Sequence, residues 1–254
     1  MSYRIMKRIV SLLPAIILLF AMNSFSSEVT IDDFRLLTEE YPPFNFKRNN
    51  FLQGISVDMM EEILKKVDAN TTREDIELLP WARAYRDVLR EKNTCLFAMT
   101  RTKEREALFK WVGPFATLKI VLTAPKYRRI IIKSIEDINK YIVGVVRDDV
   151  GEQILVQNGI IKGTLSIVHH PDINAKKLVA GRIDLWAYAD ITARWILREN
   201  GYDSNEYESV YVLKEGQLYF ALNAKTPDYL IQKLQQALDD LKTEGLHQKI
   251  LDKY

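Results

Sequence analysis

Short apolar runs alternate with amphipathic stretches along most of the chain, and this pattern predicts an α/β protein. The apolar runs are bounded by Gly, Asn, Pro or charged residues, as strands are. They cover residues 34–38, 76–79, 95–99, 120–124, 141–146, 165–168 and 183–188. Several stretches between them repeat apolar positions every three or four residues, which is the period of a helix with one buried face. Strands separated by such helices indicate parallel sheets.

The helix boundaries follow from local signals. A helix is predicted after Gly54, because apolar residues recur at four-residue spacing from Ile55 to Val67. A second helix is predicted to begin at Pro80, since proline in a first turn loses no helical hydrogen bond. The later helices end at glycines that suit a helix C-terminus. They are expected over residues 152–157, 174–180 and 191–199.

Two further extended regions do not follow this simple alternation. Residues 130–132 are apolar and are expected to continue the strand 120–124 beyond a basic turn. Residues 210–213 and 218–223 are also extended, and Lys214-Glu215-Gly216 separates them. We predict a hairpin-like or crossing pair of strands there.

The C-terminal region is predicted to be helical and to pack on the first α/β unit. Pro227 begins a run with leucines at an inward spacing, and Gly245 interrupts it. Two α/β units joined by extended segments leave a cleft between them, and such clefts bind small molecules.

The first 26 residues are predicted to be a signal peptide. Arg4, Lys7 and Arg8 precede an apolar run over residues 9–22, which is too short for a comfortable membrane span. Small residues then allow cleavage after Ser26. A retained membrane anchor is the alternative.

Composition excludes several classes of protein. Hydrophobic residues make up 47% of the 254 and charged residues 28%, which is ordinary globular usage. The formal net charge is +2, and without the three basic residues of the leader the chain has 33 basic and 34 acidic side chains. Nothing in this balance suggests nucleic-acid binding. The single cysteine, Cys95, allows no internal disulfide.

Candidate chemistry is concentrated in residues 97–115. An apolar run ends at Thr100, and the cations Arg101, Lys103 and Arg105 follow at every second position. An arginine at the end of a buried strand can face a carboxylate with a planar fork of donors. The alternative is a solvated, charged turn.

Aromatic residues lie near two other predicted strand ends. Pro42 and Pro43 hold the backbone extended, so a rigid loop presents Tyr41 and Phe44. Trp81 stands in the first turn of the helix that begins at Pro80, where it belongs either to a core stripe or to a binding site.

In this order and spacing, the motifs resemble those of the bacterial extracytoplasmic solute-binding proteins of family 3, the polar amino acid type that serve ABC transporters. The resemblance covers nearly all of the chain after the leader. The motifs are residues 41–44, Gly54 before residues 57–58, the turn 102–105, residues 180–184 and the terminal stretch 238–254.

The resemblance implies an α/β fold of the type II periplasmic binding protein kind, with two α/β lobes joined by two crossing strands and a ligand cleft between them. The implied division is a signal peptide over residues 1–26, lobe 1 over 27–118, lobe 2 over 119–213 and the rest of lobe 1 over 214–254.

The resemblance also implies roles for individual residues. Arg105 takes the place of the arginine that grips a ligand carboxylate, with the hydroxyl of Thr100 beside it. Tyr41 falls where the first loop presents an aromatic wall, and Trp81 where a ring stacks over the ligand side chain.

The second lobe departs from the family pattern. Arg147 and Asp148 stand near a helix start where many relatives have Gly-Thr. Asp190 is the nearest match to the ammonium-binding aspartate, but it comes one residue late, after the bulky Tyr188. An ordinary α-amino acid ligand is therefore in doubt. The predicted ligand-binding residues are Tyr41, Trp81, Thr100, Arg105, Arg147, Asp148, Tyr188 and Asp190.

The sequence thus predicts a periplasmic, monomeric binding protein that closes by a hinge on a small carboxylated solute and delivers it to an ABC transporter permease. No catalysis, cofactor or metal is expected, and His169-His170 are interpreted as part of a loop. One alternative is a lyase similar to cyclohexadienyl dehydratases, with Glu39, Asp148 or Asp190 as the acid. Another is a sensor module that acts on a separate membrane receptor.

Overall fold

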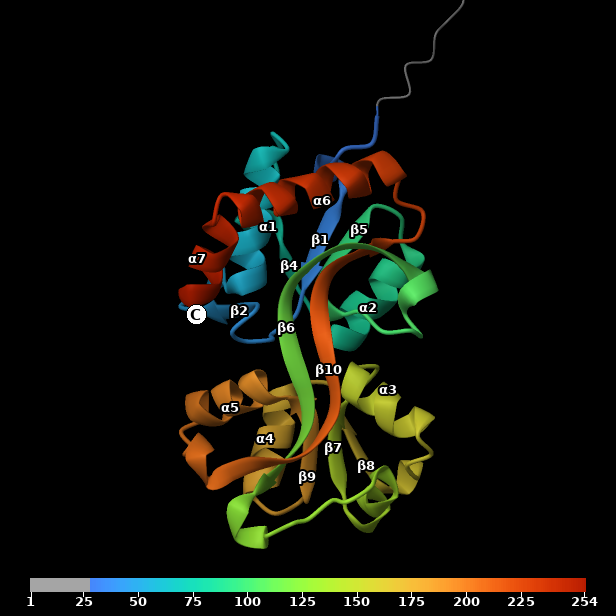
Figure 1. Cartoon of the computed structure of the whole chain (residues 1–254), viewed down its shortest axis with the longest axis vertical. Helices are drawn as coiled ribbons and strands as arrows, with labels where there is room; N and C mark the ends of the chain where they lie inside the picture. The colour runs from blue at the N-terminus through green and yellow to red at the C-terminus, as the bar shows by residue number, and fades with distance from the viewer. Residues whose placement is uncertain (1–27) are drawn as a thin grey trace, which may run out of the picture.

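Two α/β lobes lie one above the other and are joined by two long strands (Figure 1). The computed structural model describes residues 28–254. The predicted signal peptide, residues 1–26, lies outside them. Among the described residues, no helix is both long and apolar enough to cross a membrane.

Lobe 1, the upper one in Figure 1, combines a parallel sheet with helices from both ends of the chain. Its strands are β1 (Arg35–Thr38), β4 (Glu77–Leu78), β5 (Thr94–Thr100) and the separate hairpin β2 (Phe46–Arg48) and β3 (Phe51–Gln53). Its helices are α1 (Ile55–Lys66), α2 (Trp81–Arg90), α6 (Asp228–Thr243) and α7 (Leu246–Asp252). The C-terminal helices α6 and α7 both contact α1.

Lobe 2 repeats the same strand and helix alternation. Its strands are β7 (Val143–Val146), β8 (Leu165–Val168) and β9 (Leu185–Ala189), and its helices are α3 (Val150–Gln157), α4 (Pro171–Val179) and α5 (Asp190–Glu199). These three strands are mutually parallel, as predicted. Short 3-10 helices occupy Ile31–Asp33, Arg73–Asp75, Glu106–Leu108, Lys126–Arg128, Ile135–Lys140, Lys162–Thr164 and Ser204–Glu206.

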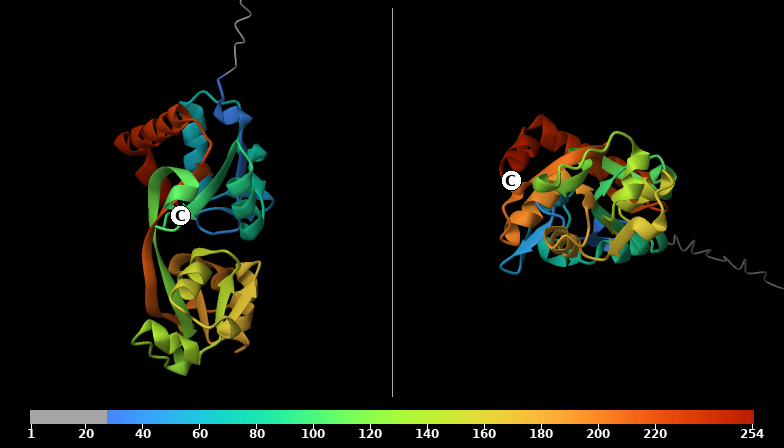
Figure 2. Two further views of the ribbon diagram at one scale, coloured as in Figure 1. Left: turned by 90° about the vertical axis from the view of Figure 1, so that its right-hand side faces the viewer. Right: turned by 90° about the horizontal axis from the view of Figure 1, so that it is seen from below.

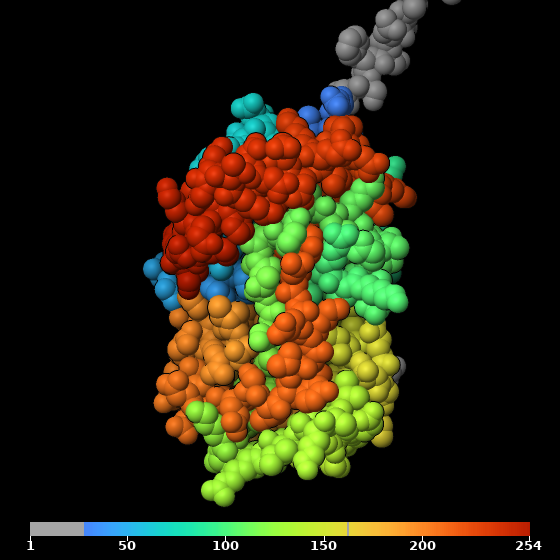
Figure 3. Space-filling view, in the orientation of Figure 1, coloured from blue at the N-terminus to red at the C-terminus, as the bar shows by residue number. Residues whose placement is uncertain are grey.

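Two antiparallel strands of 17 residues each, β6 (Phe109–Pro125) and β10 (Tyr207–Asn223), run through both lobes. They place all the main strands in one sheet with the order β4-β1-β5-β10-β6-β9-β7-β8. Seen from the side, lobe 2 and most of lobe 1 lie on the same side of the two strands, and α6 lies on their other side at the top (Figure 2, left). The space-filling view shows them exposed on that face (Figure 3). The predicted lobe boundaries fall within these continuous strands and stay a prediction.

Two strand predictions were wrong in detail. Residues 210–213 and 218–223 belong to the single strand β10, because Gly216 stays extended and pairs with Leu118 across the crossing point. Residues 130–132 form no strand. After the 3-10 helix at Lys126–Arg128, Ile130 and Ile132 turn into the lobe 2 core instead.

The buried carboxylate of Asp58 on α1 connects separate segments of lobe 1. It accepts hydrogen bonds from Arg73 Nη2 at 2.9 Å, Lys253 Nζ at 2.6 Å and Tyr254 Oη at 2.9 Å. Because these donors come from distant parts of the sequence, one acidic side chain ties the C-terminus to the first helix.

We expect Gly54→Ala to destabilise the protein by about 2–4 kcal/mol. Gly54 has φ of 127°, and a Cβ there would lie 2.3 Å from the Phe44 carbonyl oxygen. Gly159→Ala is the matched control, since Gly159 has φ of 76° but no atom within 4 Å of the added Cβ. It should cost only about 1–2 kcal/mol. Urea unfolding of both variants measures the difference, and equal losses would contradict this account of the α1 start.

Candidate functional site

The predicted site residues lie at the carboxyl ends of strands or just after them, where the two lobes face each other. In lobe 1, Tyr41 follows β1 and Arg105 follows β5. In lobe 2, Asp148 follows β7 and Tyr188 lies near the end of β9. Ligands of open α/β sheets bind at this edge, because adjacent loops diverge there and leave a crevice.

The guanidinium of Arg105 lies at the junction of the lobes. The residue is 1% exposed. Its Nη1 donates to the Thr100 carbonyl oxygen of lobe 1 at 3.2 Å. Its Nη2 donates to the Asp148 carbonyl oxygen of lobe 2 at 3.2 Å, and its Nε to Gln153 Oε1 at 3.2 Å. Arg105 therefore joins the two lobes through neutral acceptors.

Aromatic rings of α2 cover the same guanidinium. The Arg105 Cζ atom is 5.3 Å from the centroid of the Trp81 ring and 5.1 Å from that of Tyr85. Such contacts stabilise a cation through the ring quadrupole. Burial nevertheless lowers the pKa of Arg105, and the nearby Asp149 carboxylate opposes that shift. Trp81 thus packs on the charged group of the site as well as on the core.

Glu39 places a carboxylate in this cluster without a direct partner. The residue is 6% exposed, and its carboxylate has no hydrogen bond or ion pair within residues 28–254. It lines a cavity of about 260 Å³ together with Trp81 and His169. Burial raises the pKa of Glu39 well above its ordinary value; the negative charge of Asp149 adds to this, and Arg105 opposes it. A buried, unpaired carboxylate next to a cavity suits a ligand that brings a cation or a hydrogen-bond donor.

Asp149 adds a second carboxylate at the N-terminus of α3. Burial raises its pKa, while Arg105 and the backbone N–H groups of Val150 and Gly151 act in the opposite direction. Glu39 and Asp149 together outnumber Arg105, the one buried cation among the described residues. The interior of the site is therefore acidic when both are ionised.

Tyr41 and Tyr188 form the lobe-to-lobe aromatic contact at the inner wall. Their rings meet edge to face with centroids 5.4 Å apart, and Tyr188 stacks on Trp186 at 5.3 Å. Tyr188 Oη and Trp81 Nε1 are buried and have no hydrogen-bond partner among the described residues. Buried polar atoms are rarely left unpaired, so both are available to a ligand.

Three of the predicted ligand-binding residues, Arg147, Asp148 and Asp190, do not place a free side chain in the site. The side chains of Arg147 and Asp148 are exposed, and Asp148 serves the cluster through its carbonyl oxygen. The carboxylate of Asp190 pairs with Arg194 Nε at 3.0 Å and accepts from Ser209 Oγ at 2.7 Å. The structure therefore brings Tyr41, Trp81, Thr100, Arg105 and Tyr188 together with the Asp148 backbone, and gives Asp190 partners of its own.

Sequence reasoning missed Tyr85, Asp149 and Gln153 as parts of the site. Tyr85 follows Trp81 by one helical turn, and the sequence placed the two rings on one helix face but did not include Tyr85 in the site. Gln153 likewise lies one turn after Asp149 on α3. The contacts of Tyr85 and Gln153 with Arg105, and the charge of Asp149 near it, depend on segments that are far apart in the sequence, so no local pattern reveals them.

A second contact holds the lobes together on the side of the β2–β3 hairpin. Arg48 Nη2 pairs with Glu199 Oε1 of α5 at 2.7 Å. The ring of Phe46 lies 5.2 Å from that of Trp195, measured between centroids. The lobes thus meet at both sides of the aromatic wall.

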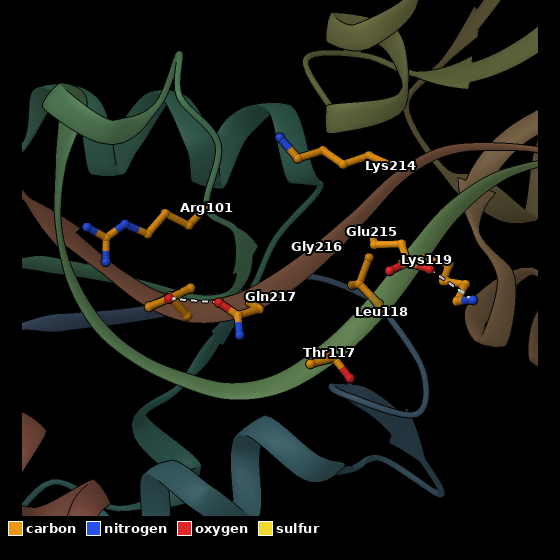
Figure 4. A pocket seen from close by; sticks show the side chains of 9 residues that line it. Arg101, Thr117, Leu118, Lys119, Lys214, Glu215, Gly216 and Gln217 are labelled. Atoms are coloured by element: carbon orange, nitrogen blue, oxygen red, sulfur yellow. Dashed lines mark hydrogen bonds and ion pairs between the residues drawn. The ribbon is translucent and has the colours of Figure 1, made fainter.

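A groove of about 710 Å³ beside the crossing strands is a less suitable site (Figure 4). Lys119 Nζ in this groove already pairs with Glu215 at 3.0 Å, and the guanidinium of Arg101 pairs with Glu106. None of the predicted ligand-binding residues lines this groove.

Comparison with known proteins supports the arrangement. The sequence profile of the bacterial extracellular solute-binding proteins, family 3, matches residues 35–254. The probable amino-acid-binding protein YxeM of Bacillus subtilis (strain 168) is 24% identical over 214 residues, covering 84% of this chain and 79% of that protein. The probable histidine-binding protein of Campylobacter jejuni is 25% identical over 231 residues, covering 84% and 81%. A solved histidine kinase sensor domain with similarity to periplasmic binding proteins has a TM-score of 0.77 at 18% identity, covering 88% of this chain and 97% of that one. This likeness confirms the two-lobed fold.

We expect Glu39→Gln to gain stability relative to the wild type as the pH rises. The folded state raises the pKa of Glu39 above its ordinary 4.5, so it holds the proton more tightly than the unfolded state does. Between 4.5 and the higher folded pKa, the wild type therefore loses stability with rising pH, and the amide does not. The difference should be small at pH ~4 and about 1–3 kcal/mol at pH ~8.

Urea unfolding at a series of pH values measures this difference. Glu74→Gln is the control, because Glu74 is exposed on the surface of lobe 1. A stability difference between Glu39→Gln and the wild type that does not change with pH would show that Glu39 is not the buried acid.

Proposed function

We propose that this chain, which belongs to the bacterial extracellular solute-binding proteins of family 3, captures a small, amino-acid-like carboxylate between its lobes in the periplasm and delivers it to an ABC transporter. The family consists of binding proteins, and curated relatives are named for amino acids. The proposal adds the ligand class, the delivery step and the residues that bind.

The observation that carries the proposal is the buried guanidinium of Arg105 between the lobes. Its acceptors there are two carbonyl oxygens and an amide oxygen, all neutral. An ionised carboxylate is a stronger acceptor for a guanidinium and can bind two N–H groups at once. A ligand carboxylate would therefore exchange with these neutral acceptors at a gain in free energy.

Glu39 is the proposed partner of the ligand's amino group. Its carboxylate is buried and unpaired within residues 28–254, whereas Asp190 already binds Arg194 and Ser209. A ligand cation at Glu39 would also balance the second negative charge, because Arg105 alone cannot neutralise both Glu39 and Asp149. When Glu39 and Asp149 are both ionised, the interior favours an amino acid, and a basic one in particular.

Ligand binding is proposed to act through hinge closure. β6 and β10 are the covalent connections between the lobes, so bending these two strands moves one lobe relative to the other. A ligand that contacts Arg105 from lobe 1 and the β7–α3 loop from lobe 2 stabilises the closed state by its additional contacts there. A permease that recognises the closed state would then receive the ligand.

We expect a copurified or screened ligand to stabilise the wild type thermally, and Arg105→Ala to abolish that stabilisation. At a ligand concentration of 100 Kd, binding adds about 2.7 kcal/mol to the free energy of unfolding. Native mass spectrometry, followed by a thermal-shift screen of amino acids, dicarboxylates and aromatic acids, identifies the ligand.

Two further variants make the result specific. Arg105→Lys keeps the charge but loses the planar fork, so it should bind more weakly than the wild type. Arg101→Ala removes a cation of the same turn that pairs with Glu106, and it should bind normally. Unchanged binding by a folded Arg105→Ala variant would refute the site.

The unusual state of Glu39 favours a second candidate function, that of a lyase similar to cyclohexadienyl dehydratases. A carboxyl group whose pKa is raised well above its ordinary value holds its proton to higher pH and can act as a general acid. Incubation with prephenate should then yield phenylpyruvate, and Glu39→Gln should abolish the product. No phenylpyruvate from the wild-type protein would exclude this function.

A further inference from the structure

A second groove opens on the outer side of the cleft, between α2 of lobe 1 and the loops before α3 and α4 of lobe 2. Its volume is about 990 Å³. Tyr85 lines it and also covers Arg105, so this groove continues outward from the inner site. Its volume is near the upper end of the range of small-molecule pockets.

Four arginines line this groove: Arg83, Arg86 and Arg90 from α2, and Arg147 from lobe 2. The three on α2 are spaced by three and four residues and so share one helix face.

Few acids compensate these charges. Asp87 lies 3.9 Å from Arg83 and 3.5 Å from Arg86, and it also lies 3.8 Å from Arg35. Arg90 and Arg147 make no ion pair within residues 28–254, and the one acidic residue that lines the groove is Asp148. The groove is therefore cationic, in contrast to the acidic inner site.

Between the arginines, the groove is apolar. Leu89 and Ile167 are each 37% exposed and Ile173 is 38% exposed, and all three line it. Large aliphatic side chains gather at this surface from both lobes. An apolar lining bordered by guanidinium groups matches a molecule with an apolar body and acidic groups at its ends.

We propose that this groove is a second binding site, for a small anion with an apolar body and at least two acidic groups, held by Arg90 of lobe 1 and Arg147 of lobe 2. The site does not depend on Arg105 or on the proposed function of the inner cleft. Because its cations belong to different lobes, an occupant stabilises the closed arrangement from the outside. Like charges that line one groove repel, and a bound dianion offsets that repulsion.

Isothermal titration with biphenyl-4,4′-dicarboxylate tests the proposal. The wild type should bind this probe, and Arg90→Ala combined with Arg147→Ala should weaken binding by about tenfold or more, the equivalent of one charge-assisted hydrogen bond. Neither arginine has an ion-pair partner among the described residues, so their removal leaves no unpaired carboxylate, and a urea curve checks folding.

Three controls separate this site from general attraction and from the inner site. Arg182→Ala removes an exposed arginine after α4 and should leave binding unchanged. The neutral biphenyl-4,4′-dicarboxamide should not bind. Arg105→Ala should bind the probe within about twofold of the wild type, whether or not the amino-acid ligand is lost.

The proposal is overturned if the wild type shows no binding at roughly millimolar probe, or if the dicarboxamide binds equally well. Equal weakening by Arg182→Ala would show that net charge alone attracts the probe. Loss of probe binding in Arg105→Ala would place the probe in the inner cleft.

Discussion

The structure depends on the burial of one guanidinium, that of Arg105, between two lobes. A buried cation is costly unless its donors are paired, and the acceptors here come from both sides of the cleft: the Thr100 carbonyl from lobe 1, and the Asp148 carbonyl and Gln153 from lobe 2. The guanidinium of Arg105 therefore has its full set of acceptors only when the two lobes are closed. An ionised acceptor on a ligand would strengthen the same link.

Charge is distributed unevenly around this link. Inside the cleft, Glu39 and Asp149 outnumber Arg105, whereas the outer groove has Arg90 and Arg147 without acidic partners among the described residues. If both proposals hold, the two environments favour opposite ligand charges within one interlobe region. Burial strengthens the inner interactions, while water and salt weaken the outer ones.

The contacts within lobe 1 indicate where the proposed movement of one lobe relative to the other takes place, namely in the two strands that connect the lobes. Asp58 fixes the C-terminal helix to α1, so lobe 1 behaves as one body although its sequence is divided. In the proposed closure, the elements that bend are then β6 and β10. On the hairpin side, the Arg48–Glu199 pair adds an exposed contact that contributes about 0–1 kcal/mol to closure, much less than a paired buried charge does.

The sequence by itself determined most of the order of strands and helices, because apolar periodicity and glycine or proline boundaries are local properties. It also identified Arg105, Trp81 and Tyr41, which lie at strand or helix ends within recognisable motifs. Only the tertiary structure decided that Glu39 is buried without a partner, that Asp190 binds Arg194 instead, and that β10 is continuous. Burial and pairing depend on which distant segments meet, and that information resides in the packing of one lobe against the other.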